Sequence, residues 1–169
     1  MKNNHCFFLI CVLCIFTLSG CTPKENGDNI SAFCYRMNSY NETYNLTPDG
    51  YIFDDIEGSY TRFFILSDGT DLMLQFKTDE KNRIYQMNIT LPLQNNTTEN
   101  EAFFFITDCI TAFCNDNKAA NQLTEEINLK SALTVVDFKT KKAEIGKISI
   151  KTDTTEIGTV ISLYNNNYT

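Results

Sequence analysis

The sequence predicts an α+β fold, a single antiparallel sheet of about five to six strands with two helices packed on one face of it. Strand-like segments come first, helical segments follow and strand-like segments return, without the strand–helix alternation of a parallel sheet. Short turns join the early strand-like segments, which predicts an antiparallel meander. The helical segments have one apolar side, which requires a sheet to pack against.

The meander is the clearest segment. Residues 62–66 form an apolar run, whereas residues 72–77 and 85–91 alternate between apolar and polar side chains. Asp68-Gly69 is a strong hairpin signal between the first two strands, and residues 79–82 form a second turn. Shorter strands are expected at residues 33–38, where apolar and polar side chains also alternate, and near residues 51–53.

Two helices are predicted after the meander. Thr98 and Glu101 have the spacing of a capping box, so the first helix should run over about residues 99–115. Its apolar side chains fall on one face at helical period: Ala102, Phe103, Ile106, Cys109, Ile110, Phe113 and Cys114. A weaker helix over about residues 118–130 would turn three apolar side chains inward: Ala120, Leu123 and Ile127.

The end of the chain returns to strand patterns. Residues 133–139, 144–151 and 156–164 are rich in β-forming residues. Turns are predicted at Lys141-Lys142 and at Asp153-Thr154. We expect one globular domain over residues 32–169, preceded by a polar, flexible tether over residues 21–31.

The first 21 residues form a distinct segment. After Lys2, residues 6–18 are almost wholly apolar, which matches the hydrophobic region of a signal peptide and is shorter than the roughly 20 residues of a spanning helix. Leu18-Ser19-Gly20-Cys21 follows at once. This pattern in this position resembles the lipobox of bacterial lipoproteins. The resemblance covers residues 1–21 only.

The resemblance implies how the protein is held in place. A signal peptidase would remove residues 1–20, and Cys21 would carry a thioether-linked diacylglycerol and an N-acyl chain such as palmitate. Two or three chains make a stable membrane anchor, whereas one binds only marginally. The expected location is the extracytoplasmic face of the cell membrane or outer membrane. Thr22 in place of Asp is similar to cargo sent to the outer membrane of a two-membrane bacterium.

Charge and histidine content exclude several classes of function. The chain has 14 basic and 21 acidic residues; cleavage would remove only Lys2 among them, which leaves 13 basic residues and a net charge of −8. Nucleic acid is therefore not an expected partner. The one histidine, His5, lies in the leader, so catalysis that depends on an imidazole is excluded from the mature chain. We predict a non-enzymatic protein without a cofactor.

Three cysteines remain outside the leader and the anchor. Cys109 and Cys114 are five residues apart, which on a helix separates them by roughly 140° and argues against a bond between them. Either Cys34 pairs with one of them, or all three are free thiols that act as small apolar residues. The second alternative is favoured.

An aromatic, Asn-rich stretch over residues 35–60 supplies the candidate binding surface. Tyrosine combines a large contact area with a polar tip, which suits an interface with a protein or an envelope polymer. The alternative is that these rings cover the sheet edge and close the core. The candidate residues are Tyr40, Tyr44, Tyr51, Phe53 and Tyr60.

Four carboxylates lie close together in the same stretch: Asp49, Asp54, Asp55 and Glu57. Oxygen ligands of this kind suit Ca²⁺, but their spacing does not match an EF-hand loop. They are weak metal candidates, and a solvated acidic loop is the favoured interpretation.

These observations predict a lipid-anchored binding or accessory domain for an envelope protein or polymer. One alternative is a small hydrolase of envelope glycans that works through two carboxylates, which should then face each other in a pocket. Another is a lipoprotein that binds a small ligand or Ca²⁺.

Overall fold

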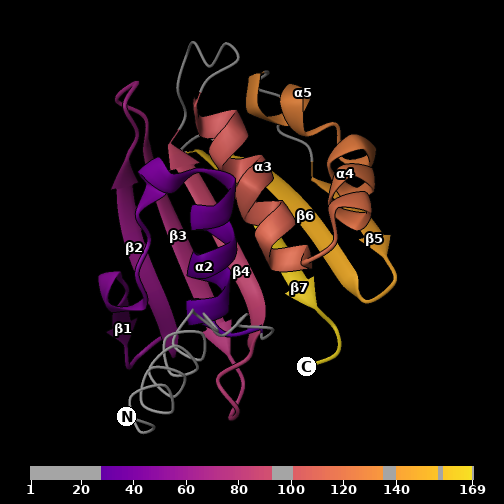
Figure 1. The fold of residues 1–169 in the computed structure, drawn as a ribbon. Coiled ribbons are helices and arrows are strands. Elements are labelled where there is room, and N and C mark those ends of the chain that lie inside the picture. The colour runs from indigo at the N-terminus through magenta and orange to yellow at the C-terminus, as the bar shows by residue number, and fades with distance from the viewer. Residues whose placement is uncertain (1–27, 93–100, 135–139, 156–157, 169) are drawn as a thin grey trace, which may run out of the picture.

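The described residues fold into one antiparallel sheet of seven strands with four α-helices, shown in Figure 1. This computed structural model describes residues 28–92, 101–134, 140–155 and 158–168. The predicted α+β class and single antiparallel sheet are confirmed. The predicted count of about five to six strands was too low, since the sheet holds seven.

The strand order places the C-terminal strand near the middle of the sheet. The order is β1-β2-β3-β4-β7-β6-β5, and every neighbouring pair is antiparallel. β7 therefore joins the N-terminal meander to the hairpin of β5 and β6. The strands are β1 (Ile52–Asp54), β2 (Ser59–Ile65), β3 (Asp71–Thr78), β4 (Ile84–Pro92), β5 (Lys141–Ile145), β6 (Ile148–Thr155) and β7 (Gly158–Asn165).

The predicted meander is present with its predicted turns. In the first turn Leu66 and Thr70 are joined by a backbone hydrogen bond of 2.9 Å, and Gly69 adopts a φ of +83°, which glycine reaches without steric cost. Leu74 pairs with Ile89 across β3 and β4, and both are fully buried. The alternation read from the sequence therefore separates a core face from a polar face.

Helices lie across the sheet. Figure 1 shows α2 and α3 over one face of it, and α4 lies beside β5. The helices are α2 (Ile30–Tyr40), α3 (Glu101–Cys114), α4 (Asn117–Glu126) and α5 (Leu129–Thr134), with short 3-10 helices η1 (Glu42–Tyr44) and η2 (Pro48–Gly50). Among the described residues, none of the helices combines the length and the apolar character needed to cross a bilayer.

α2 replaces the strand predicted at residues 33–38. The side chain of Asn29 accepts a hydrogen bond from the Ala32 N–H at 2.8 Å and caps the helix. Phe33 and Met37, four residues apart, are both fully buried, as on one face of a helix. The domain also begins earlier than residue 32, because the Asp28 carbonyl accepts from the Ile84 N–H at 2.7 Å.

The later boundaries differ as well. The predicted helix over residues 118–130 is interrupted where Asn128 takes a φ of +47°, although its three predicted inward residues are buried. Lys141-Lys142 begins β5 and Asp153-Thr154 lies within β6, so neither pair is a turn. The turn falls between β5 and β6, at Gly146. Leu133 belongs to α5 rather than to a strand, whereas residues 135–139 and the Thr98 cap lie outside the described residues.

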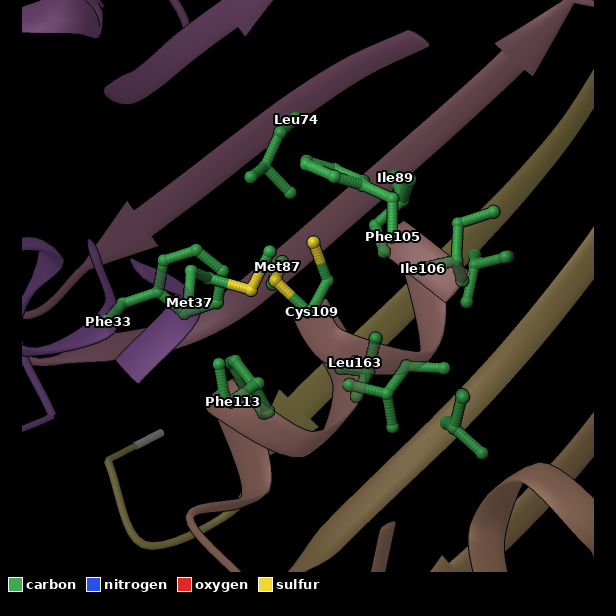
Figure 2. Packing of buried hydrophobic residues seen from close by; sticks show 14 of the residues in the cluster. Phe33, Met37, Leu74, Met87, Ile89, Phe105, Ile106, Cys109, Phe113 and Leu163 are labelled. Carbon is green, nitrogen blue, oxygen red and sulfur yellow. The ribbon is translucent and has the colours of Figure 1, made fainter. Parts of the chain in front are cut away.

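The core is formed between the helices and the sheet, as Figure 2 shows. The rings of Phe33 and Phe76 meet edge to face at 4.8 Å. No disulfide joins Cys34, Cys109 and Cys114 to one another; Cys34 and Cys109 are buried, and burial raises the pKa of Cys109 well above its usual value. The favoured alternative, in which Cys34 forms no disulfide with Cys109 or Cys114, is therefore confirmed.

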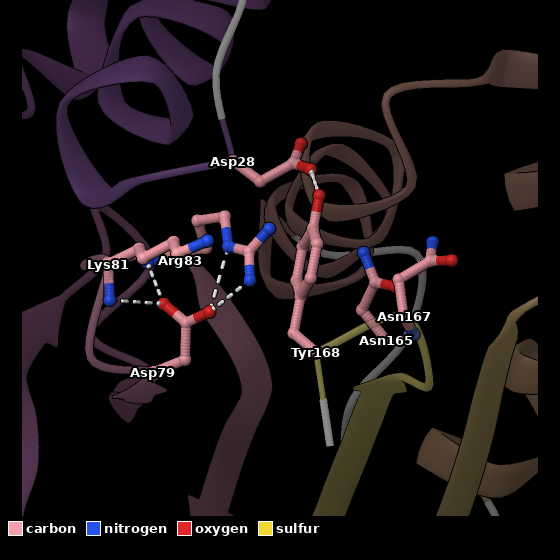
Figure 3. A network of polar contacts seen from close by, with 7 residues as sticks. All are labelled: Asp28, Asp79, Lys81, Arg83, Asn165, Asn167 and Tyr168. Carbon is pink, nitrogen blue, oxygen red and sulfur yellow. Dashed lines mark hydrogen bonds and ion pairs between the residues drawn. The ribbon is translucent and has the colours of Figure 1, made fainter.

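A polar network ties both ends of the domain together (Figure 3). The Arg83 guanidinium donates to the Asp79 carboxylate at 2.5 and 2.8 Å and lies 4.0 Å over the Tyr168 ring. The Tyr168 hydroxyl in turn donates to Asp28, just before α2. The start of α2, the β3–β4 turn and the C-terminal end are thus held together.

Candidate functional site

A pocket of about 620 Å³ lies where η1, the end of β2 and the first half of α3 meet. We call it the Tyr44 pocket. Its aromatic walls and two carboxylates come from three separate segments of the chain: Tyr40, Tyr44, Phe64, Phe104, Phe105, Glu101 and Asp108. Its volume is in the range of small-molecule and side-chain binding sites.

One face of α3 supplies four of these side chains. Glu101, Phe104, Phe105 and Asp108 are spaced by three, four and seven residues, which places them on neighbouring turns of one side of the helix. Phe105 is buried and forms the base of the pocket. Its ring lies 5.1 Å from that of Tyr44 and 5.2 Å from that of Phe64.

Asparagines hold η1 and its tyrosine in place. The Asn41 side chain accepts from the Thr43 N–H at 3.0 Å and caps η1. The Asn38 side chain bonds both backbone groups of the buried Leu46, at 2.8 and 2.9 Å. These local bonds fix the loop between α2 and β1, so Tyr44 faces α3 in a defined position.

Asp108 is the central polar group of the pocket. The Tyr44 hydroxyl donates to its carboxylate at 2.7 Å. Burial raises the pKa of Asp108, and the hydrogen bond from Tyr44 opposes that shift. Burial and the hydrogen bond to Asp108 also raise the pKa of Tyr44, which therefore keeps its proton.

Glu101 has a different role at the edge of the pocket. Its carboxylate accepts a hydrogen bond from the Ser67 N–H at 2.8 Å and another from the Ser67 hydroxyl. The β2–β3 turn is thereby fastened to the first turn of α3, where a negative charge also suits the helix dipole.

The predicted surface residues fall into three places. Tyr40 and Tyr44 line the Tyr44 pocket. Phe53 and Tyr60 lie together on β1 and β2, with ring centres 4.8 Å apart, outside that pocket. Tyr51 differs from the prediction, since it is only 8% exposed and belongs to the core beside Phe76.

Sequence reasoning did not find the contribution of α3. Phe104 was not among the predicted surface residues, yet it is 61% exposed at the pocket. The available signal was its position off the apolar stripe, with Asp108 four residues later on the same side of the helix.

The acidic loop does not assemble a metal site within the described part of the chain. Asp54 accepts from the Ile56 and Glu57 N–H groups at 2.8 and 3.2 Å and so holds its own turn. Glu57 accepts from the Gln75 amide at 2.8 Å. No group of three or more His, Cys, Asp or Glu among the described residues, Asp49 and Asp55 included, is arranged to hold a metal ion.

Comparisons with protein-family models, with curated proteins and with solved structures found no match to this chain. The chemistry of the pocket is therefore argued from its own groups. Its rings offer large contact surfaces, and its carboxylates are acceptors of hydrogen bonds and partners for positive charge.

Proposed function

We propose that this chain is a lipid-anchored, extracytoplasmic binding or accessory domain that docks an envelope protein through the Tyr44 pocket. The observation that carries the proposal is the pocket itself, in which five aromatic residues surround about 620 Å³ and Phe104 stands 61% exposed at its mouth. Exposed aromatic residues next to a pocket are typical anchor points of protein interfaces. Figure 1 shows α2 and α3 over one face of the sheet, and the residues of the Tyr44 pocket lie at the ends of α2 and β2 and in the first half of α3.

The anchor is part of the same proposal. The pattern ending at Cys21 supports lipidation, and Asp28 follows only seven residues later, a distance of at most about 25 Å when extended. Tyr40 lies at the far end of α2, about 15 Å along the helix from Ile30. The pocket would therefore lie away from the attachment point and remain open to a partner.

The anchor is tested by the mass of the protein purified from bacterial membranes. We expect a chain that begins at Cys21 and carries a diacylglycerol thioether. Cys21→Ala should abolish both lipidation and cleavage. An unmodified Cys21 thiol in the native product would contradict the proposal.

The docking surface is tested with a matched pair of phenylalanines. Phe104 lines the pocket, whereas Phe63 is 72% exposed and is not among the lining residues. We expect Phe104→Ser to reduce crosslinking of the anchored protein to its partner on cells, and Phe63→Ser to leave it unchanged. Equal crosslinking by both variants, with equal melting temperatures, would remove the Tyr44 pocket as the docking surface.

The hydrolase alternative receives less support. Glu101 and Asp108 both line the pocket, but they lie two helical turns apart, and both oxygens of Glu101 accept hydrogen bonds from Ser67. A pair of catalytic carboxylates needs one group that is free to act as nucleophile or base, at roughly 5–10 Å from the other. The absence of histidine from the mature sequence also favours binding over catalysis.

A further inference from the structure

The Tyr44 pocket has a one-sided charge. Its described lining includes the carboxylates of Glu101 and Asp108 and no lysine or arginine. The Arg62 guanidinium lies 4.9 Å over the Phe64 ring but does not line the pocket. An anionic ligand would therefore meet only like charge inside the pocket.

The ring faces add to this preference. Tyrosine and phenylalanine faces attract cations within about 6 Å of the ring centre. The described residues already form such contacts, with Arg62 over both Tyr51 and Phe64 and with Arg83 over Tyr168. The Tyr44 pocket combines such faces with a carboxylate, which is the usual composition of a site for an ammonium or guanidinium group.

Asp108 is the group that such a cation would meet. Within the described residues, the hydrogen bond that its carboxylate accepts comes from the neutral Tyr44 hydroxyl, and no lysine or arginine forms an ion pair with it. A half-buried carboxylate without a positive partner is less favourable than the same group in water. A cation bound beside it would compensate that cost and would form a charge-assisted hydrogen bond.

We propose that the Tyr44 pocket accepts the lysine or arginine side chain of a partner protein, held between the aromatic faces and the Asp108 carboxylate; this inference rests on the proposed docking function. The mouth favours a protein-borne side chain over a free amine, because Ile65 and Phe104 are exposed there and offer apolar contact around the cation. A charged anchor within an apolar rim is the arrangement of many interface hot spots.

The test compares two peptides that differ in charge alone. Binding of acetyl-Leu-Arg-Phe-amide to the full lipidated protein in detergent is followed by NMR shifts of the pocket residues. The control peptide carries citrulline, a neutral isostere, in place of arginine. We expect the arginine peptide to bind about tenfold more tightly, and its advantage to shrink when NaCl rises from about 50 mM to about 500 mM.

Two variants with the same change in charge locate the effect. Asp108→Asn keeps an acceptor for the Tyr44 hydroxyl and should remove the advantage of the arginine peptide. Asp55→Asn changes an exposed carboxylate outside the pocket and should preserve it. Equal binding of both peptides, no binding of either up to about 10 mM, or equal effects of both variants would overturn the inference.

A third probe separates the two sources of the cation. The probe is hexylammonium, a free amine. If hexylammonium shifts the NMR signals of the pocket residues and neither peptide does so, the ligand is a free amine and the choice of a protein side chain is overturned. The crosslinking experiment with Phe104→Ser is independent of charge. If Phe104→Ser no longer crosslinks to the partner while the arginine and citrulline peptides bind with equal affinity, the docking function is supported and the preference for a cation is wrong.

Discussion

Asp108 lines the proposed docking pocket at a position where burial disfavours its charged form. Its carboxylate is half-buried beside Phe105, and among the described residues a tyrosine hydroxyl, rather than a cation, donates to it. Desolvation of the charged form raises its pKa. A residue whose ionised form is disfavoured in the folded protein contributes little to stability, which is consistent with a role in recognition.

We predict that Asp108→Asn raises the melting temperature at pH 7. Because the folded state holds the Asp108 proton more tightly than the unfolded state, stability falls as the pH rises from the unfolded pKa, about 3.9, through the raised folded pKa. Asparagine removes that loss. Melting temperatures of the two proteins should therefore differ at pH 7 and converge below about pH 3. A variant less stable than the natural chain at pH 7 would show that the charge of Asp108 stabilises the fold.

Gly158 marks a place where two backbones meet. A Cβ atom at this position would lie 2.1 Å from the Leu91 carbonyl oxygen of β4. We predict that Gly158→Ala destabilises the protein by roughly 2 kcal/mol, because backbone atoms cannot move aside as a flexible side chain would. Urea unfolding measures the change.

The control for this substitution is Gly69→Ala. Gly69 also has a positive φ, but no atom lies within 4 Å of the Cβ that alanine would add. Only the strain of the left-handed conformation remains, about 1 kcal/mol. A cost at Gly69 as large as that at Gly158 would contradict the role of the close approach to Leu91.

At the scale of elements, the Asp79–Arg83 pair holds the β3–β4 turn against both ends of the domain. The Arg83 hydrogen bond lowers the pKa of Asp79. Its contribution to stability is therefore present above the unfolded pKa and is lost as the pH falls through the lowered folded pKa. We predict that Asp79→Asn lowers the melting temperature at pH 7 and that the difference disappears in strong acid.

Glu80→Gln is the matched control, since Glu80 is an exposed carboxylate of the same turn. Asparagine at position 79 still offers an oxygen to the Lys81 and Arg83 N–H groups, so the turn itself should persist. If both variants melt alike at pH 7, the network of Figure 3 does not contribute through the Asp79 charge.

Elements defined by local signals were the ones that the sequence predicted well. β3 and β4 alternate over many residues, and turns with their own hydrogen bonds join them to each other and to the apolar run of β2, so neighbours in the chain decide their structure. α2 was missed because six residues of alternation, 33–38, fit a strand and a helix equally. Its helical form is decided by the cap at Asn29 and by burial against Phe76, which lies in β3.

Only part of the Tyr44 pocket could be predicted, because here too the sequence shows directly only what local patterns decide. Tyr40 and Tyr44 stood out because aromatic residues crowd a loop-like stretch. Asp108 is 64 residues from Tyr44 in the chain, and their hydrogen bond depends on the way α3 crosses the sheet. No local pattern shows that two residues so far apart in the chain lie close together in space, so the carboxylates of α3 could not be assigned to the aromatic loop.

At the scale of the whole molecule, the net charge and the proposed anchor act in opposite directions. The mature chain would carry a net charge of −8, which is repelled by anionic lipid headgroups. Acyl chains bind through apolar burial, which salt does not weaken. The proposed attachment therefore depends on Cys21 and not on the surface of the domain.

We predict that the lipidated protein stays with anionic vesicles in flotation at about 1 M NaCl, because screening removes only charge effects. A chain that begins at Thr22 should not float with neutral or with anionic vesicles at any salt concentration. Domain folding in the shorter chain is verified by its melting temperature, which should equal that of the lipidated form. Flotation of the Thr22 chain with anionic vesicles at low salt would mean that the domain surface itself binds lipid, and release of the lipidated protein by salt would mean that charge rather than acyl chains holds it.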